Sequence, residues 1–139
     1  MSNLDEKIAL VTGGARGIGR AICEAMTEAG SSVAVADLRE DDAADTAKAV
    51  GDMAVKMDVT NLASIAEGLA KVEQAWGGVE ILVNNAGISI SKSLVETTVQ
   101  DWDLQHDIMA RGSFLVSREA TKAMIAQKMG GDIIYISSK

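Results

Sequence analysis

Thr12-Gly13-Gly14-Ala15-Arg16-Gly17-Ile18-Gly19 is the stretch of the sequence that decides the fold. The apolar run Ile8–Thr12 comes directly before it, and apolar residues recur with helical spacing over Ile18–Ala29 after it. Glycines between a strand and a helix let the backbone approach a pyrophosphate closely, and the free N–H groups of the helix N-terminus favour its negative charge. We therefore expect a dinucleotide-binding turn. Its expected contact residues are Gly13, Ala15, Arg16, Gly17, Ile18 and Gly19.

Strand-length apolar runs alternate with stretches of helical period along the rest of the chain, and no linker or repeat interrupts them. The expected strands are Ile8–Thr12, Val33–Ala36, Met53–Val59, Val79–Val83 and Ile133–Ser137. The expected helices are Ile18–Ala29, Asp41–Val50, Leu62–Trp76 and a long one from about Val99 to Met129. Strands separated by crossover helices are parallel and wound right-handed. The order predicts an α/β fold, a Rossmann-type doubly wound parallel sheet with helices on both faces, in one domain over residues 1–139.

Composition and charge exclude several classes of protein. The 139 residues are 47% apolar and 24% charged, as in an ordinary globular protein. No apolar run approaches the ~20 residues needed to span a bilayer, and Met1–Lys7 lacks the features of a signal peptide, so we expect a cytoplasmic protein without membrane contact. The net charge of -7 with scattered basic residues makes a nucleic-acid partner unfavourable.

Cysteine and histidine are too few for a metal site. Cys23 is the sole cysteine and falls on an expected helix among apolar neighbours, which is typical of a buried thiol. His106 is the sole histidine, and without a second imidazole it is best interpreted as an exposed residue of a helix face. We expect no metal.

An acidic residue at the end of the second strand indicates which dinucleotide is bound. Asp37 follows the glycine turn at close to the ~20-residue spacing at which a carboxylate accepts hydrogen bonds from the adenosine ribose hydroxyls. A carboxylate there repels a 2′-phosphate, so NAD is favoured over NADP, although Arg16 and Arg39 lie near enough in sequence to compensate in part. We also expect Leu38, the next residue, to contact the adenosine ribose or its surroundings. The alternative for Asp37 is a solvated acid at a strand end.

The glycine turn, Thr-Gly-x-x-x-Gly-x-Gly, combines with Asn84-Asn85-Ala86-Gly87 after the fourth strand. Together these motifs resemble the short-chain dehydrogenase/reductase family, and the resemblance extends over the whole chain. It implies an oxidoreductase that moves a hydride between a nicotinamide cofactor and a secondary alcohol or ketone. In the family the second motif braces the sheet and lines the cofactor cleft, which implies that role for Asn84, Ala86 and Gly87. We include Asn85 among the expected cofactor contacts.

The resemblance also implies an adenine site and one catalytic residue. Asp58 matches an acid that binds the adenine amino group, and the N–H of Val59 matches a donor to an adenine ring nitrogen. Ser138 matches the family's catalytic serine, which hydrogen-bonds the substrate oxygen. The Tyr135 and Lys139 pair has the spacing of the catalytic Tyr-x-x-x-Lys, but on a strand it would be separated by ~13 Å. Such residues cooperate only on a helix.

The family's tyrosine follows its serine by a dozen or so residues. We therefore expect this chain to be truncated after the fifth strand, without its catalytic and substrate part, and to be inactive by itself. The family's helix asparagine is replaced by Met109, which cannot make the side-chain hydrogen bonds. The competing interpretation is a dinucleotide-binding fragment or a pseudoenzyme that does not turn over.

The long expected helix indicates a substrate class and a self-association. Its stretch from Asp107 to Ala120 resembles dehydrogenase domains joined to sugar-phosphate aldolases, which implies a sugar, polyol or hydroxyaldehyde substrate. Family members usually associate as dimers or tetramers, often through this helix. We therefore expect a small-molecule alcohol or ketone as substrate and a homo-dimer or homo-tetramer.

Overall fold

A five-stranded parallel sheet forms the centre of the computed structural model, which describes residues 3–50 and 52–138. Its strands are β1 (Ile8–Thr12), β2 (Ser32–Asp37), β3 (Met53–Lys56), β4 (Ile81–Asn84) and β5 (Asp132–Tyr135). They lie in the order β3-β2-β1-β4-β5, and every neighbouring pair is parallel. The chain order reverses between β1 and β4, and doubly wound sheets form their ligand crevice at such a point, beyond the carboxyl ends of the strands.

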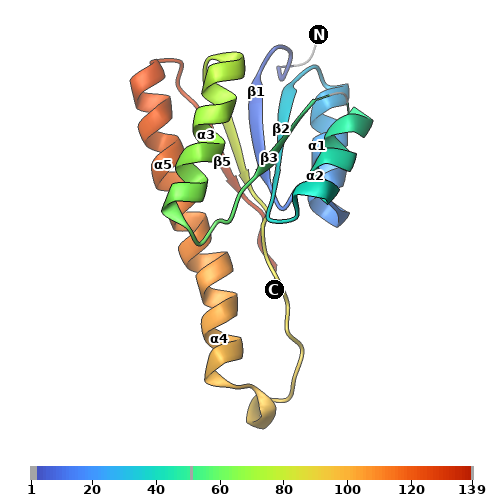
Figure 1. The fold of residues 1–139 in the computed structure, drawn as a ribbon, viewed down its shortest axis with the longest axis vertical. Helices are drawn as coiled ribbons and strands as arrows, with labels where there is room; N and C mark the ends of the chain where they lie inside the picture. The colour runs from blue at the N-terminus through green and yellow to red at the C-terminus, as the bar shows by residue number, and fades with distance from the viewer. Residues whose placement is uncertain (1–2, 51, 139) are drawn as a thin grey trace.

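Helices cover both faces of the sheet. Helices α1 (Gly17–Glu28) and α2 (Glu40–Val50) lie on one face, and α3 (Leu62–Trp76) and α5 (Gly112–Gln127) lie on the other (Figure 1). Alternate strand residues enter two separate cores, so that Val11 packs with α1 and α2 while Leu10 packs with α3 and α5. This confirms the predicted Rossmann-type fold. None of the helices in the described part of the chain is long and apolar enough to cross a membrane.

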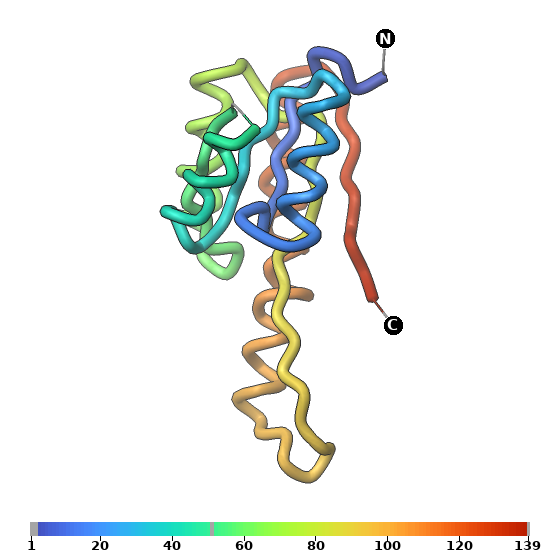
Figure 2. The backbone as a smooth tube through the Cα atoms, turned by 90° about the vertical axis from the view of Figure 1, so that its right-hand side faces the viewer, coloured from blue at the N-terminus to red at the C-terminus, as the bar shows by residue number. Residues whose placement is uncertain are grey.

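A narrow arm, residues 88–106, extends beyond the carboxyl edge of the sheet (Figures 1 and 2). It consists of a loop with the 3-10 turn η1 (Leu94–Glu96) and the returning helix α4 (Val99–His106). Thr98 and Asp101 form a capping box at the start of α4, and the Ile90 N–H donates to Gln105 Oε1 at 3.2 Å. The Ile90–Gln105 bond and the ion pair between Lys92 Nζ and Asp101 Oδ2 (2.7 Å) join the loop to α4, a helix with no buried residue.

The predicted long helix exists but is not uniform. A π-helical segment, η2 (Asp107–Arg111), joins α4 to α5, and the helix ends at Gln127 with Lys128 in the left-handed region (φ 56°). The helix predicted from about Val99 to Met129 is therefore interrupted by a π segment, and it ends two residues earlier than predicted.

Several strand boundaries also differ from the predicted ones. Strand β3 ends at Lys56 instead of Val59, because the Asp58 N–H donates to Ser64 Oγ and leaves the ladder. Strand β4 begins at Ile81 instead of Val79, whose N–H donates to Gln127 Oε1. Strand β5 ends two residues before the predicted Ser137.

Candidate active site

A cleft of about 670 Å³ opens at the carboxyl edge of the sheet, between β1, β2 and β4. Its volume lies within the usual range for cofactor sites. Of the predicted cofactor-binding residues, those that line it are Gly13, Arg16, Gly17, Ile18, Gly19, Asp37, Leu38, Asp58, Val59, Asn85, Ala86 and Gly87. Ala15 is the exception, since it is only 5% exposed and lies beneath the turn. The lining also includes Ile88, Leu104 and Ile108, which carried no motif in the sequence.

The glycine turn brings backbone close to backbone at the start of α1. A Cβ at Gly19 would overlap the carbonyl oxygen of Gly13, so a side chain there would push α1 away from the turn. Gly17 adopts a left-handed φ of 57°, which other residues reach only with strain. Arg16 is the N-cap of α1 and makes no side-chain capping bond. The N-terminal N–H groups of the helix therefore face the cleft without a capping side chain, as anion binding requires.

Thr12 joins the glycine turn to the Asn-Asn-Ala-Gly segment. Its buried hydroxyl accepts hydrogen bonds from the N–H groups of Asn85 and Ala86, each at 3.0 Å. The Asn85 side chain in turn donates to the carbonyls of Thr12 (3.2 Å) and Gly13 (3.1 Å). Asn85, in addition to lining the cleft, thus fixes the floor of the turn to the end of β4. The family resemblance implied that this segment braces the sheet, but it did not distinguish the roles of Asn84 and Asn85.

Asn84 braces a different part of the sheet. Its Nδ2 donates to the buried hydroxyl of Ser117 on α5 at 2.9 Å. The Tyr135 hydroxyl donates to the same Ser117 oxygen at 2.9 Å. This cluster joins β4, β5 and α5 behind the cleft, so the expectation that Tyr135 is a residue of the sheet is confirmed. Lys139 lies outside the described residues, and its separation from Tyr135 stays a prediction.

Ser138 follows β5 on the cleft side of the sheet. Tyr135 pairs in register with Asn84, and the ladder continues with the Ile136 N–H donating to the Asn84 carbonyl at 3.0 Å. Ser138 comes three residues after Tyr135, as Gly87 comes three residues after Asn84. The ladder between the two strands ends before these residues, and Ser138 is not among the residues that line the cleft. Its side chain is exposed.

Asp37 is held by two backbone donors at the end of β2. Its Oδ2 accepts from the Ala15 N–H at 3.2 Å and its Oδ1 accepts from the Arg39 N–H at 3.1 Å. Arg39 itself pairs with Asp42, with Nε 3.0 Å from Oδ2. The carboxylate is thus oriented by the protein, which leaves further lone pairs on both oxygens for other donors.

Asp58 and Val59 lie in the loop that follows β3. Asp58 Oδ1 accepts from the Thr60 N–H (2.9 Å) and from the Thr60 hydroxyl (2.7 Å), which fixes the acid in a tight turn. The Val59 side chain is buried beneath the π segment: a Cβ at Gly112 would lie 2.7 Å from Val59 Cγ2. Gly112 donates its N–H to the Asp107 carbonyl, the bond that closes the π turn. The close approach of Gly112 to Val59 therefore packs the π segment against the loop that follows β3.

Met109 lies within this π segment, at the position of the family's asparagine. Its Cγ and Sδ lie 3.4 Å from where a Cβ of Gly87 would be, so the side chain packs over the Asn-Asn-Ala-Gly segment. The helix distortion is therefore present without an asparagine side chain. The thioether fills the space but supplies no strong hydrogen bond.

Comparison with known proteins agrees with this geometry. The family described as short chain dehydrogenase matches residues 7–139, nearly the whole chain. The chain belongs to the short-chain dehydrogenase family. It is 41% identical to a sorbitol dehydrogenase of Cereibacter sphaeroides, over 98% of this chain and 54% of that protein. It is 31% identical to an NAD-dependent glycerol dehydrogenase of Listeria innocua, over 99% of this chain and 54% of that protein.

A solved structure of the same family has the same fold. The structure of a short-chain type dehydrogenase/reductase from Mycobacterium marinum superposes with a TM-score of 0.91 at 33% sequence identity. The match covers 97% of this chain and 55% of that one. This short-chain dehydrogenase chain thus spans about half the length of these three relatives.

Two titratable residues of this short-chain dehydrogenase lie away from the cleft surface. Burial raises the pKa of the Cys23 thiol to about 12, so the thiol stays protonated beneath the glycine turn. His106 is exposed on α4, where its ring stacks on Trp102 with the centroids 4.0 Å apart. Among residues 3–50 and 52–138, no group of His, Cys, Asp and Glu is placed to hold a metal ion.

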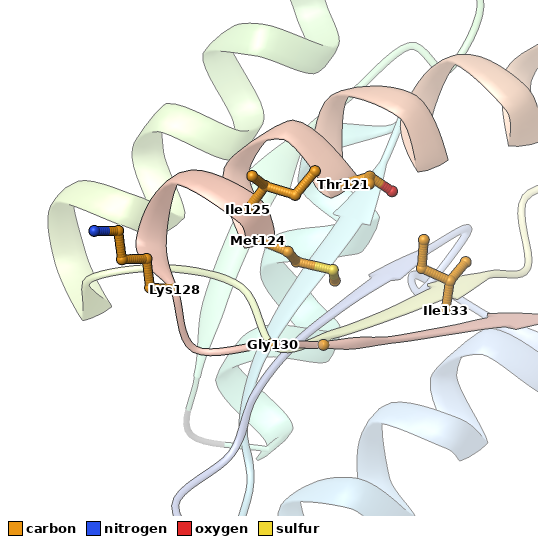
Figure 3. A pocket seen from close by; sticks show the side chains of 7 residues that line it. Thr121, Met124, Ile125, Lys128, Gly130 and Ile133 are labelled. Atoms are coloured by element: carbon orange, nitrogen blue, oxygen red, sulfur yellow. The ribbon is translucent and has the colours of Figure 1, made fainter.

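A second hollow lies at the opposite end of the sheet from the first cleft. It lies between the last turns of α5 and the start of β5 and is lined by Met124, Ile125 and Ile133 (Figure 3). Met124 also packs against Gly131, where a Cβ would lie 2.9 Å from its Cε. Thr121 and Lys128 complete a mainly apolar lining, which contains none of the predicted site residues.

Proposed function

We propose that this protein is an NAD-dependent oxidoreductase that moves a hydride between the nicotinamide and a secondary alcohol or its ketone. The observation that carries the proposal is the Asp37 carboxylate, oriented at the ribose end of a cleft whose other end lies at Gly87. The family membership supports the oxidoreductase class, and the acid supports NAD.

The charges around Asp37 favour NAD over NADP. A carboxylate at this place accepts hydrogen bonds from ribose hydroxyls and repels a 2′-phosphate. Arg39 is the residue best placed to offset that repulsion, but its guanidinium pairs with Asp42. Arg16 also lines the cleft and gives the 2′-phosphate its second potential partner. The relative from Listeria innocua carries NAD dependence in its name, which is consistent with this choice.

The residues of the cleft fit a dinucleotide. The Gly13–Gly19 turn leaves space that side chains would fill, and the N-terminus of α1 offers uncapped N–H groups to a pyrophosphate. Asp58 and Val59 would hold the adenine, and Asn85, Ala86 and Gly87 would line the nicotinamide half. The bound cofactor supplies the hydride chemistry, while the protein orients the reactants. Ser138 would hydrogen-bond the oxygen of the substrate.

The substrate class that we propose is a polyol, a sugar or a related hydroxy compound. The names of two relatives, a sorbitol and a glycerol dehydrogenase, support it. We further propose a cytoplasmic homo-dimer or homo-tetramer that associates through the long helix, on which Trp102 and Phe114 are both 59% exposed.

For these 139 residues by themselves, we propose dinucleotide binding without turnover. The single tyrosine, Tyr135, lies on a strand and donates its hydroxyl to Ser117, so it does not act as the general acid or base. Met109 cannot replace the hydrogen bonds of the family's asparagine. A complete active site would require a tyrosine and lysine from further sequence.

Titration with NADH and NADPH tests the proposal, using nicotinamide fluorescence as readout. Asp37→Ala should weaken NADH binding by about tenfold or more, because hydrogen bonds to a charged group contribute about 1.5–3 kcal/mol. Asp45→Ala, an exposed acid on α2, is the matched control and should bind like the wild type. Unchanged NADH affinity in Asp37→Ala would remove Asp37 from the ribose site. Absence of NADH binding in the wild type would overturn the proposal itself.

A further inference from the structure

A buried threonine of α2 holds the underside of the glycine turn. The hydroxyl of Thr46 donates to the Ala15 carbonyl at 2.7 Å, across 31 residues of sequence. Thr46 is 0% exposed, and the neighbouring buried positions on α2 are Ala43 and Ala47. A threonine is a poorer helix former than the alanines around it. Its hydroxyl therefore has a specific partner in an otherwise apolar helix face.

Hydrogen bonds hold both peptide groups that flank Ala15. Its carbonyl accepts from Thr46, and its N–H donates to Asp37 Oδ2 at 3.2 Å. The hydrogen bonds thus run from the α2 hydroxyl through two consecutive peptide units to the carboxylate at the ribose end of the cleft. This also explains why Ala15, predicted as a cofactor contact, does not line the cleft: its side chain packs in the core.

We propose that Thr46 is a positioning residue for cofactor discrimination, which acts through Ala15 on Asp37. The inference rests on the proposed binding of NAD at Asp37. Without the hydroxyl, the buried Ala15 carbonyl has lost its donor, and the turn must move to satisfy it. Movement of the Ala15 N–H releases one oxygen of Asp37, so the carboxylate loses the orientation in which it accepts ribose hydroxyls.

The ratio of NADPH to NADH dissociation constants separates this role from a merely structural one. A loosened turn weakens both dinucleotides through the pyrophosphate, but only a reoriented Asp37 changes the preference between them. Arg16 stays in the cleft lining to attract a 2′-phosphate, so the preference for NADH should decrease.

The experiment measures both dissociation constants for Thr46→Val, which keeps the shape of the side chain and removes the hydroxyl. We expect NADH affinity to decrease about five- to tenfold, with a smaller change for NADPH. Thr27→Val is the matched control: Thr27 lies on α1 and donates to Asp52 Oδ2 at 3.1 Å, at the opposite end of the sheet. It should lower the midpoint of thermal unfolding and leave the ratio unchanged.

Thr46→Ser is the second variant, since it keeps the hydroxyl and removes only a methyl group. The proposal requires that Thr46→Ser keep the wild-type ratio of the NADPH to the NADH dissociation constant. A lower ratio in Thr46→Ser would overturn the proposal even if Thr46→Val does not fold. A Thr46→Val protein that is less stable but keeps the wild-type ratio would also overturn it. A wild type that binds neither dinucleotide contradicts the proposed function instead, so the two failures are distinguishable.

Discussion

The β1–β2 side and the β4–β5 side of the sheet differ in how completely their side chains are buried. On the β1–β2 side, the five residues of β1 are all buried and α1 and α2 cover the face. On the β4–β5 side, β5 leaves Ile134 and Tyr135 44% and 57% exposed, and η1 presents Leu94 and Val95 at 90% and 93% exposure. The cleft at the carboxyl edge of the sheet is built mainly from the first side. The residues of the cleft are therefore held in place by contacts on the β1–β2 side, whereas β5 and η1 leave apolar side chains exposed to water.

The largest effect should come from Gly19→Ala, on the buried side. The new Cβ would overlap the Gly13 carbonyl oxygen and meet the Asn85 side chain, both of which are fixed by other bonds. We expect NADH binding to be lost and the free energy of unfolding to decrease by about 3 kcal/mol or more. Fluorescence titration and thermal unfolding measure the two effects.

Gly77→Ala is the control for Gly19→Ala. Gly77 has a φ of 90° but no neighbour near a new Cβ, so alanine there introduces backbone strain without a collision. It should cost about 1 kcal/mol and leave NADH affinity unchanged. Wild-type affinity in Gly19→Ala would show that the turn tolerates a side chain and that the cleft does not depend on this close approach.

Paired truncations test the contrast in burial directly. Leu10→Ala on β1 removes a side chain that is 0% exposed and should cost about 2–5 kcal/mol through lost burial and a cavity. Ile134→Ala on β5 removes a side chain that is already 44% exposed and should cost under about 1 kcal/mol. Urea unfolding followed by circular dichroism measures both. Equal losses would mean that the exposed side of the sheet is buried in solution, as in an oligomer.

Local signals in the sequence predicted the fold well. The bounds of β1 and α3 agree with the predicted ones to the residue, because apolar runs end at glycines in one case and Asn61 and Gly77 cap the helix in the other. Most of the predicted cofactor residues line one cleft because their motifs all fall at carboxyl ends of parallel strands.

Contacts between distant residues explain what the sequence did not predict. The π segment is packed through Gly112 against Val59, 53 residues away in the sequence. Thr46 meets Ala15 only because α2 packs beneath the glycine turn, and a threonine in an alanine-rich helix gives no local sign of that bond. Such residues act through packing, which spacing along the chain does not encode.

The smallest effect should be an acid transition confined to the arm. Lys92 Nζ lies 2.7 Å from Asp101 Oδ2, and the Thr98 N–H donates to the same oxygen, which together lower the pKa of Asp101 to about 2. The ordinary pKa of an aspartate is about 3.9. The ionised Asp101 therefore stabilises the start of α4 at neutral pH and down to about pH 4. That contribution is lost as the pH falls toward 2.

Trp102 fluorescence in a Trp76→Phe background should follow this transition, because Trp102 lies one residue after Asp101 on a helix with no buried residues. Asp101→Asn should abolish the change between pH 4 and pH 2, and Asp103→Asn, an exposed acid two residues on, should retain it. Persistence of the change in Asp101→Asn would assign it to another group. Because the arm packs on neither core, the far-ultraviolet signal of the sheet and its helices should stay constant while α4 unwinds, which separates a local opening from acid unfolding of the whole chain.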